Sequence, residues 1–154
     1  MAAAEHLPRV LFLCTGNSCR SQMAEGFARA MHSSRIEAHS AGTKPHGLNP
    51  LAVRAMHEAG VDISGHASKT PDAIGITFDL VVTVCGHADE HCPHFPGARV
   101  VHVGFDDPPR LAAGAASDDE AMPHYRRVRD EIRAFVTTVE RLLPDACRHE
   151  GHQP

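Results

Sequence analysis

The pattern of apolar residues predicts a chain that alternates between strands and helices. Val10–Leu13 and Leu80–Val84 are short apolar runs of the kind that form strands, and Arg99–Val103 is another. Both Leu80–Val84 and Arg99–Val103 are apolar on both faces, which is typical of central strands in a covered parallel sheet. Ile36–Ala38 is a weaker strand candidate, so the sequence predicts four strands.

Three segments carry apolar residues at helical spacing. The first is Arg20–His32. The second begins at Asn49 and Pro50, an N-cap followed by a proline in the first turn, and ends at Gly60. The third spans roughly Glu120 to Leu143 and is closed by Pro144. The apolar face of the first helix is predicted to consist of Met23, Phe27, Ala30 and Met31.

Strands that alternate with helices predict an α/β fold, with a four-stranded parallel sheet flanked by helices. The 154 residues fit a single domain, 1–154, with flexible ends at residues 1–8 and 145–154. A content of 42% hydrophobic and 22% charged residues is that of a globular protein. The net charge of -4 and the absence of a Lys/Arg-rich run argue against binding to nucleic acid.

The apolar runs are too short to span a bilayer, so no contact with a membrane is expected. The N-terminal residues MAAAEHLPRV lack the basic and apolar regions of a secretory signal, and we expect a cytoplasmic monomer. In that compartment, the five cysteines indicate catalytic or metal-binding thiols rather than structural disulfides.

The sequence LFLCTGNSCRS at residues 11–21 joins the first strand to the first helix. This loop lies at the carboxyl edge of the sheet, where α/β proteins bind ligands, and the helix N-terminus there attracts an oxyanion. Arg20 adds a planar set of donors, and Gly16 and Asn17 can adopt the left-handed angles that turn successive N–H groups inward. The residues predicted to bind a tetrahedral oxyanion are Thr15, Gly16, Asn17, Ser18, Cys19 and Arg20.

Cys14 is placed under the bound oxyanion, where its sulfur would be aimed at the central atom. A helix N-terminus and a nearby arginine lower the pKa of a thiol from about 8.5 toward neutrality, and Ser21 can donate a hydrogen bond to the sulfur. The alternative is a buried strand-end cysteine without a chemical role, which is the usual state of an isolated cysteine. The coincidence of Cys14, Arg20 and Ser21 at a strand-to-helix turn favours a nucleophile.

The motif Cys-x5-Arg-Ser after a short strand resembles that of the low-molecular-weight tyrosine phosphatases. The sequence at this motif, CTGNSCRSQMAEG, resembles that of the thioredoxin-coupled arsenate reductases, which have the same fold. The resemblance runs from about Val10 to Leu143. It includes SAG at 40–42, HGLNP at 46–50, DLVVTVC at 79–85 and GFDDP at 104–108.

The resemblance implies a relay of three cysteines without a bound cofactor. Cys14 would attack arsenate while Arg20 holds the oxygens and Asp107 protonates the leaving oxygen. Cys85 would then attack the Cys14 sulfur and release arsenite, and Cys92 would take over the disulfide from Cys14. Reduced thioredoxin would reduce the resulting disulfide, and phosphate or sulfate would bind as analogues of arsenate.

Other functions remain open at this point. A tyrosine phosphatase could use Cys85 and Cys92 to protect Cys14 from oxidation, although Pro109 and Arg110 replace the aromatic residues that usually flank a phenyl ring. A redox sensor or arsenic-binding protein would not need an acid before a proline. Zinc held by the two later cysteines is weakly indicated, because Cys-x6-Cys is not a usual zinc spacing. Glutaredoxin could replace thioredoxin as the electron donor.

A cation site under the loop is also implied for some relatives. Asn17, Glu25 and Ser40 resemble positions that help to hold potassium there, together with a Thr-Ser-Asp stretch. Here residues 67–69 read ASK, so an ammonium replaces a carboxylate ligand. We therefore expect no potassium site, and we expect Lys69 to reach Glu25 in place of the ion.

Two cysteines and one loop are given no chemical role. Cys19 matches a cysteine of the family and is expected to be a structural thiol. Cys147 lies in the polar tail, outside the resemblance. The stretch LAAGAASDDEAMP at residues 111–123 lengthens the loop after the acid, and covering the active site is one role that it could have.

Overall fold

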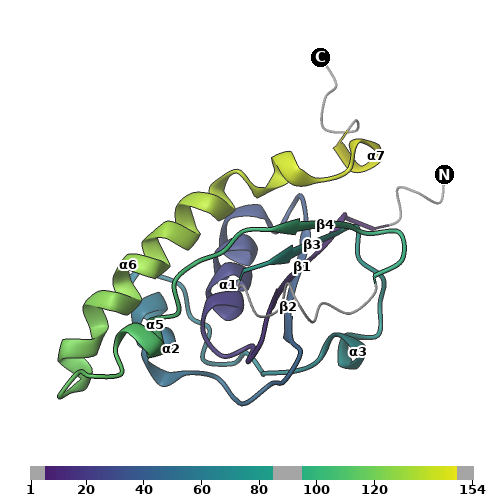
Figure 1. Ribbon diagram of the computed structural model, residues 1–154. Coiled ribbons are helices and arrows are strands. Elements are labelled where there is room, and N and C mark those ends of the chain that lie inside the picture. Colours follow the sequence, from purple (N-terminus) through teal and green to yellow (C-terminus); the bar gives the residue numbers. More distant parts are fainter. Residues whose placement is uncertain (1–5, 85–94, 149–154) are drawn as a thin grey trace.

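The computed structural model describes residues 6–84 and 95–148 (Figure 1). Among these residues, four parallel strands form one sheet in the order β2-β1-β3-β4, which confirms the predicted fold class. Each strand pairs only with parallel neighbours, so the carboxyl ends of the strands lie at one edge. The strands are β1 (Arg9–Cys14), β2 (Glu37–Gly42), β3 (Leu80–Thr83) and β4 (Arg99–His102).

Helices pack against this sheet and against one another (Figure 1). Helix α1 contacts β1 and β2, and α6 lies along α1, α2 and α5. The last predicted helix ends earlier than expected, because α6 stops at Thr137 and a separate 3-10 helix, η2, follows. The helices are α1 (Arg20–His32), α2 (Pro50–Glu58), α3 (Pro71–Ile74), α5 (Pro108–Leu111), α6 (Asp118–Thr137), η2 (Val139–Leu142) and α7 (Asp145–Arg148).

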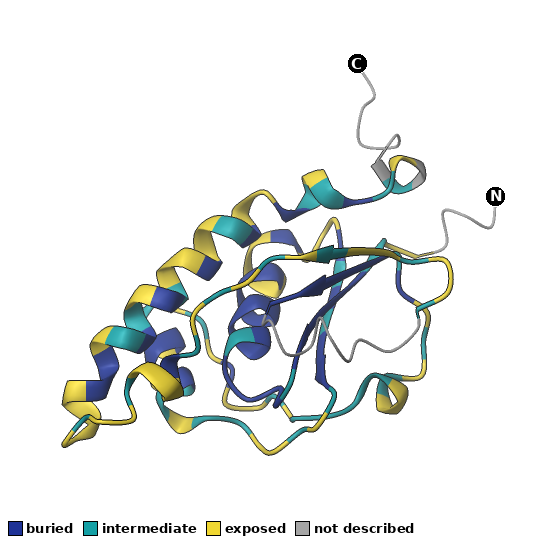
Figure 2. Ribbon diagram, in the orientation of Figure 1, coloured by how far each residue is buried: buried dark blue, intermediate teal, exposed yellow. Residues whose placement is uncertain are grey.

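Burial of α1 differs from the predicted amphipathic pattern (Figure 2). Residues 21–28 are all buried, polar side chains included, whereas Ala30 and Met31 are exposed. The prediction that Ala30 and Met31 belong to the core is therefore wrong. The first two turns of α1 lie between the sheet and the helices α2 and α6, whereas in the last turn only His32 is buried, against the Val136 carbonyl of α6.

Strand β4 is an edge strand rather than the predicted central one. Its neighbour in the sheet is β3, and Val100 is 39% exposed. By contrast, every residue of β3 is buried, because β3 lies between β1 and β4 (Figure 2). Apolar residues on both faces of a strand thus indicated burial correctly for Leu80–Thr83 and wrongly for Arg99–His102.

Residues 118–123 of the insertion at 111–123 form the start of α6. The Ser117 hydroxyl accepts a hydrogen bond from the Glu120 N–H at 3.2 Å, and the Glu120 carboxylate accepts one from the Ala116 N–H at 3.0 Å. These two bonds satisfy the N–H groups of Glu120, in the first turn, and of Ala116, just before the helix. Ala121 and Met122 then pack into the core, so much of the insertion is helix rather than loop.

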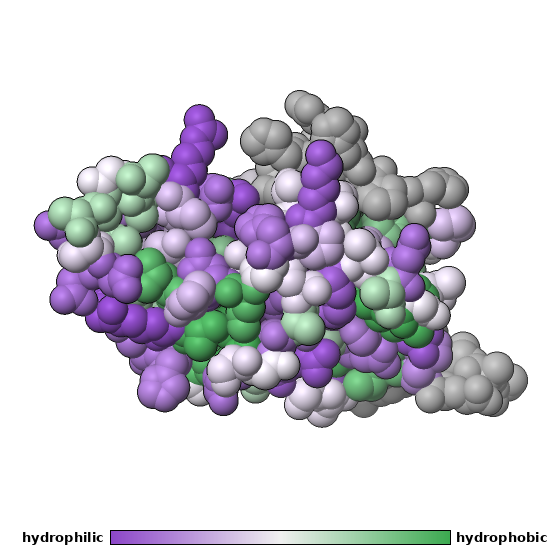
Figure 3. Space-filling view, turned by 90° about the horizontal axis from the view of Figure 1, so that it is seen from below, coloured by the Kyte–Doolittle hydropathy of each residue, from purple (hydrophilic) through white to green (hydrophobic). Residues whose placement is uncertain are grey.

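The surface is mixed in character. Figure 3 shows a face on which hydrophobic side chains form small separate patches among hydrophilic ones. Within residues 6–84 and 95–148, none of the helices combines the length and the apolar character that crossing a membrane requires.

Candidate active site

The loop between β1 and α1 is held from outside through its carbonyl groups. These bonds turn the carbonyls away from the loop centre, which leaves the N–H groups to face inward. One such group, the Asn17 N–H, donates to the Cys14 sulfur at 3.2 Å. The outside donors are Lys44 N to Thr15 O (2.8 Å), His46 N and Ser68 Oγ to Gly16 O (3.1 and 2.9 Å), Gln22 Nε2 to Asn17 O (3.0 Å) and Asn49 N to Ser18 O (3.0 Å).

A pocket of about 440 Å³ opens above this loop. It has room for a tetrahedral oxyanion with its hydration water. Asn17 is not among the residues that face the pocket; its side chain lies beneath the loop and is buried. The residues that form the pocket are Cys14, Thr15, Gly16, Ser18, Cys19, Arg20, His46, Asp107 and Pro109.

Sequence reasoning missed one of these residues, His46, and misjudged a backbone angle. His46 stands in the HGLNP stretch that carried the resemblance, but it had no assigned role. Asn17 adopts the predicted left-handed conformation, with φ of 47°. Gly16 does not, since its φ is not positive, so backbone freedom is not the reason for a glycine there.

Cys14 is 3% exposed and lies at the floor of the pocket. Its sulfur is 2.9 Å from the Ser21 hydroxyl and accepts from the Asn17 N–H. The Ser21 hydroxyl oxygen already accepts a hydrogen bond from Asn17 Nδ2 at 2.8 Å, so its own hydrogen is available for the sulfur. Two donors aimed at the sulfur favour the thiolate form.

The orientation of the Asn17 amide is fixed by its surroundings. The Lys69 backbone N–H donates to Asn17 Oδ1 at 2.9 Å, so the amide nitrogen must face Ser21 and Ser40. The Ser40 hydroxyl in turn donates to Glu25, whose side chain is 5% exposed. A buried carboxylate therefore sets the direction of a hydrogen-bond chain that ends at Cys14.

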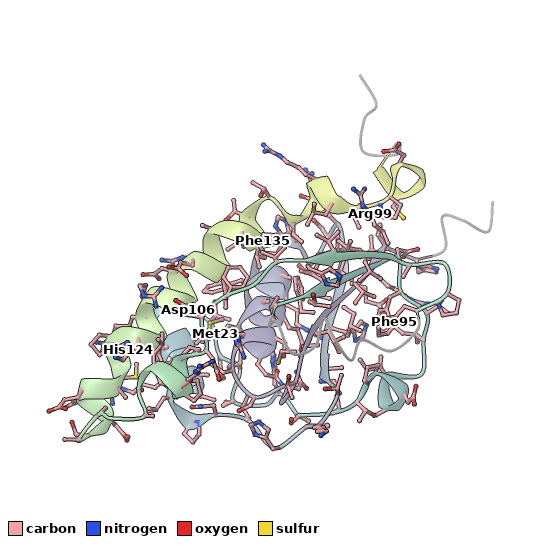
Figure 4. The ribbon with its side chains drawn as sticks, viewed as in Figure 1. Met23, Phe95, Arg99, Asp106, His124 and Phe135 are labelled. Carbon is pink, nitrogen blue, oxygen red and sulfur yellow. The ribbon has the colours of Figure 1, made fainter. Side chains whose placement is uncertain are left out.

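Arg20 and Asp107 meet on the opposite side of the pocket. Arg20 Nη1 donates to the Phe105 carbonyl at 2.8 Å, and Nη2 lies 3.5 Å from Asp107 Oδ1. Asp106 instead pairs with Arg127 of α6 at 3.0 Å on the surface (Figure 4). Asp107 and not Asp106 therefore lines the pocket together with Cys14.

These features of the site are a cysteine at the end of the first strand, five loop residues and an arginine, and an aspartate before a proline. The sequence model of the low molecular weight phosphotyrosine protein phosphatase family matches residues 9–145. The chain belongs to this family.

Within this family the chain is similar to proteins named arsenate reductase. That of Halalkalibacterium halodurans is 49% identical over 131 residues, which cover 84% of this chain and 92% of the relative. A solved arsenate reductase in the phosphate binding state has a TM-score of 0.73 and 28% identity, covering 90% of this chain and 100% of its own. The thioredoxin-dependent arsenate reductase of Corynebacterium glutamicum has a TM-score of 0.62 and 28% identity, covering 90% of this chain and 65% of its own.

The cation site of some family members does not fit this chain. Glu25 forms an ion pair with Arg29, one turn further along α1, at 2.7 Å. The Lys69 ammonium donates to the Ala67 carbonyl at 2.8 Å, so Lys69 is not the direct partner predicted for Glu25. A guanidinium on the same helix holds the carboxylate, and a potassium ion would have to displace it. Among the described residues no group of three or more His, Cys, Asp or Glu side chains could hold a metal ion.

Cys19 faces the pocket but is 4% exposed. Burial raises its pKa far above the ordinary thiol value, although the Arg20 charge opposes this shift. Burial therefore favours the neutral thiol form of Cys19. Cys147, in α7, is half-buried.

Tyr125 does not form an aryl-binding wall. This single tyrosine of the chain is 3% exposed, and its hydroxyl accepts from Asn49 Nδ2 at 3.0 Å. Burial raises the pKa of Tyr125. Among the described residues, the walls beside Arg20 and Asp107 are formed by His46 and Pro109.

Cys85 and Cys92, the other two members of the predicted relay, lie outside the described residues. The chain reaches them through Val84, which is buried. The Val84 N–H donates to the Leu13 carbonyl at 2.9 Å, one residue before Cys14. Cys85 therefore follows directly on a residue that is bonded to the strand carrying the nucleophile.

Proposed function

We propose that this protein reduces arsenate to arsenite through Cys14, Cys85 and Cys92, and that thioredoxin restores the reduced enzyme. The observation that carries the proposal is the Cys14 sulfur, which lies under a pocket formed by inward-facing amides, Arg20 and Asp107. The similarity to arsenate reductases over most of the chain supports the choice of substrate.

In the first step the Cys14 thiolate attacks the arsenic atom. A sulfur–arsenic bond forms and an arsenic–oxygen bond breaks. Asp107 gives its proton to the leaving oxygen, which departs as water. The loop amides and Arg20 stabilise the charge on the remaining oxygens during the attack.

In the second step the Cys85 thiolate attacks the Cys14 sulfur. The electron pair of the sulfur–arsenic bond stays on arsenic, which leaves as arsenite, and a Cys14–Cys85 disulfide remains. Cys92 attacks Cys85, so that the disulfide becomes Cys85–Cys92 and Cys14 is again a thiolate. Two thiols thus supply the two electrons that the reduction requires.

Reduced thioredoxin is the proposed electron donor. A relative of the same fold is described as thioredoxin-dependent, and a dithiol donor suits a disulfide between two protein cysteines. Glutaredoxin is the alternative donor that a direct comparison would reveal. The protein would act as a cytoplasmic monomer of one domain without a bound cofactor.

The test is arsenate-dependent oxidation of NADPH in the presence of thioredoxin and thioredoxin reductase. The wild type should turn over, and Cys14→Ser, Cys85→Ser and Cys92→Ser should each stop. Cys147→Ser is the matched control, because Cys147 lies in α7 and is not among the pocket residues, and it should retain full activity. Replacing thioredoxin by glutaredoxin identifies the donor.

The alternative function is a tyrosine phosphatase with a protective cysteine pair. Hydrolysis of p-nitrophenyl phosphate by the same variants separates the two functions. An arsenate reductase should hydrolyse this ester slowly and lose the activity only in Cys14→Ser. Brisk ester hydrolysis by a wild type that cannot reduce arsenate would assign the protein to the phosphatases.

A further inference from the structure

His46 occupies a place in the active site that no step described so far uses. It belongs to the stretch between β2 and α2 and is exposed, yet it forms part of the pocket together with Cys14 and Arg20. Its backbone N–H donates to the Gly16 carbonyl at 3.1 Å, which ties the residue to the oxyanion loop whatever its side chain is.

The side chain of His46 packs directly on Gly16. A Cβ atom at position 16 would collide with the imidazole ring, and the ring atom closest to that position is Nε2. Because the φ of Gly16 is not positive, the glycine is needed here for space rather than for backbone freedom. The missing side chain lets the ring of His46 reach over the loop toward the oxyanion site.

A bound oxyanion would gain from a further hydrogen-bond donor at the position of His46. Arg20 Nη1 already donates a hydrogen bond to the Phe105 carbonyl, and Nη2 lies beside Asp107. Part of the guanidinium is therefore occupied by the segment that carries Asp107, residues 105–110, which we call the acid loop. A tetrahedral oxyanion whose arsenic is above the Cys14 sulfur still points oxygens away from the loop amides. The His46 ring lines the same pocket as Cys14 and Arg20, so an imidazole N–H there is available to such an oxygen.

We propose that His46 binds the substrate by donating a hydrogen bond from its ring to an oxygen of the bound arsenate. This inference rests on the proposed function and assigns a residue of substrate recognition to it. A wall formed by a polar ring also favours a free inorganic oxyanion over an aryl phosphate ester, whose phenyl group would need an apolar surface. After reduction, uncharged arsenite accepts a weaker hydrogen bond than the arsenate anion does, so His46 favours the substrate over the product.

The experiment measures how inorganic phosphate protects Cys14 from iodoacetamide. The readout is the phosphate concentration that halves the alkylation rate, so differences in the intrinsic reactivity of Cys14 cancel. We expect His46→Leu to raise this concentration about tenfold or more, which is the cost of a lost hydrogen bond to a charged group. His46→Gln, which keeps an N–H donor, should stay within about threefold.

His57→Gln is the matched control. His57 is an exposed histidine in the last turn of α2 and is not among the pocket residues. The phosphate concentration that halves the alkylation rate of Cys14 should therefore not change. In steady-state assays of the intact enzyme, His46→Leu should raise KM for arsenate by a similar factor and leave kcat within about twofold, since an interaction made with both substrate and transition state is lost.

A second pair of variants tests the role of the ring position. Gly16→Ala should push the ring of His46 aside and weaken protection by phosphate. In a His46→Ala background the same change has no ring to displace and should add little. Additive effects of the two changes would mean that Gly16 acts through the loop alone.

The outcomes separate this inference from the proposed function. If phosphate does not protect Cys14 in the wild type, the oxyanion site itself is refuted, and the proposed function with it. If phosphate protects the wild type and His46→Leu equally well, the loop binds oxyanions and only the role of His46 is overturned.

Discussion

The two loops that meet across the pocket are built in opposite ways. In the oxyanion loop, Cys14 and Asn17 are buried, and backbone and side-chain hydrogen bonds hold its carbonyls from outside. In the acid loop, the side chains of Asp106 and Asp107 are 62% and 38% exposed. Phe105 attaches that loop to the rest of the molecule. Its carbonyl accepts a hydrogen bond from Arg20, and its ring centroid lies 5.9 Å from the ring centroid of Phe135.

The difference fits what the proposed reaction requires of each loop. The nucleophile side binds a charge that develops in the transition state, and donors fixed in advance do this without a cost of reorganisation. In the proposed reaction Asp107 would give up a proton in every cycle and regain one, so exposure to water would be useful there. We therefore expect substitutions in the oxyanion loop to affect stability and reactivity together, and substitutions in the acid loop to affect reactivity alone.

The largest effect is expected for Asp107→Asn. The amide cannot donate a proton as an acid does, so kcat/KM for arsenate should fall about 10²- to 10⁴-fold. The free energy of unfolding, measured with urea, should change by less than about 1 kcal/mol, because the Arg20–Asp107 pair is partly exposed. Asp106→Asn is the control, since Asp106 pairs with Arg127 at the surface, and it should keep activity within about twofold. Equal losses in both variants would remove the distinction between the two aspartates.

A smaller effect on rate, joined to a loss of stability, is expected for Asn17→Gly. Glycine accepts the φ of 47° without strain but removes the amide that connects Ser21, Ser40 and the Lys69 N–H. The free energy of unfolding should drop by about 1–3 kcal/mol, the cost of leaving buried polar groups unsatisfied. The alkylation rate of Cys14 at neutral pH should fall as well. Unchanged stability would show that this network does not hold the loop.

The smallest effect on arsenate turnover is expected from replacing sodium by potassium. Because Arg29 already pairs with Glu25, potassium should raise arsenate turnover no more than sodium does at equal ionic strength. A clear preference for potassium would contradict the displacement of the ion by Arg29. In that case Arg29→Gln should increase the preference, since the carboxylate would be left without its guanidinium.

Much of the oxyanion loop could be predicted from the sequence because its residues are contiguous. Cys14, Arg20 and Ser21 lie within eight positions, and a strand-to-helix turn fixes where they point. Asp107 came from the resemblance alone, because an aspartate before a proline is otherwise an ordinary turn residue. The fold class followed from the alternation of strands and helices, which is set by local periodicity.

The features that were missed depend on contacts between distant segments. His46 reaches the loop through a hydrogen bond to Gly16, and no local pattern marks it. Whether a strand is central or at an edge depends on its neighbours, so Arg99–His102 was placed wrongly. The Glu25–Arg29 pair was different: its spacing of four residues on a helix was readable in the sequence and was overlooked in favour of Lys69.

The burial of α1 has a consequence for how the protein can diverge. Residues 21–28 are all buried, and Ser21 among them contacts the Cys14 sulfur, so the structure behind the floor of the pocket leaves little room for variation. The pocket is completed by His46, on a connecting segment, and by Pro109, in the first turn of the short helix α5. New substrate preferences can therefore arise at these two positions while the thiolate chemistry is inherited unchanged.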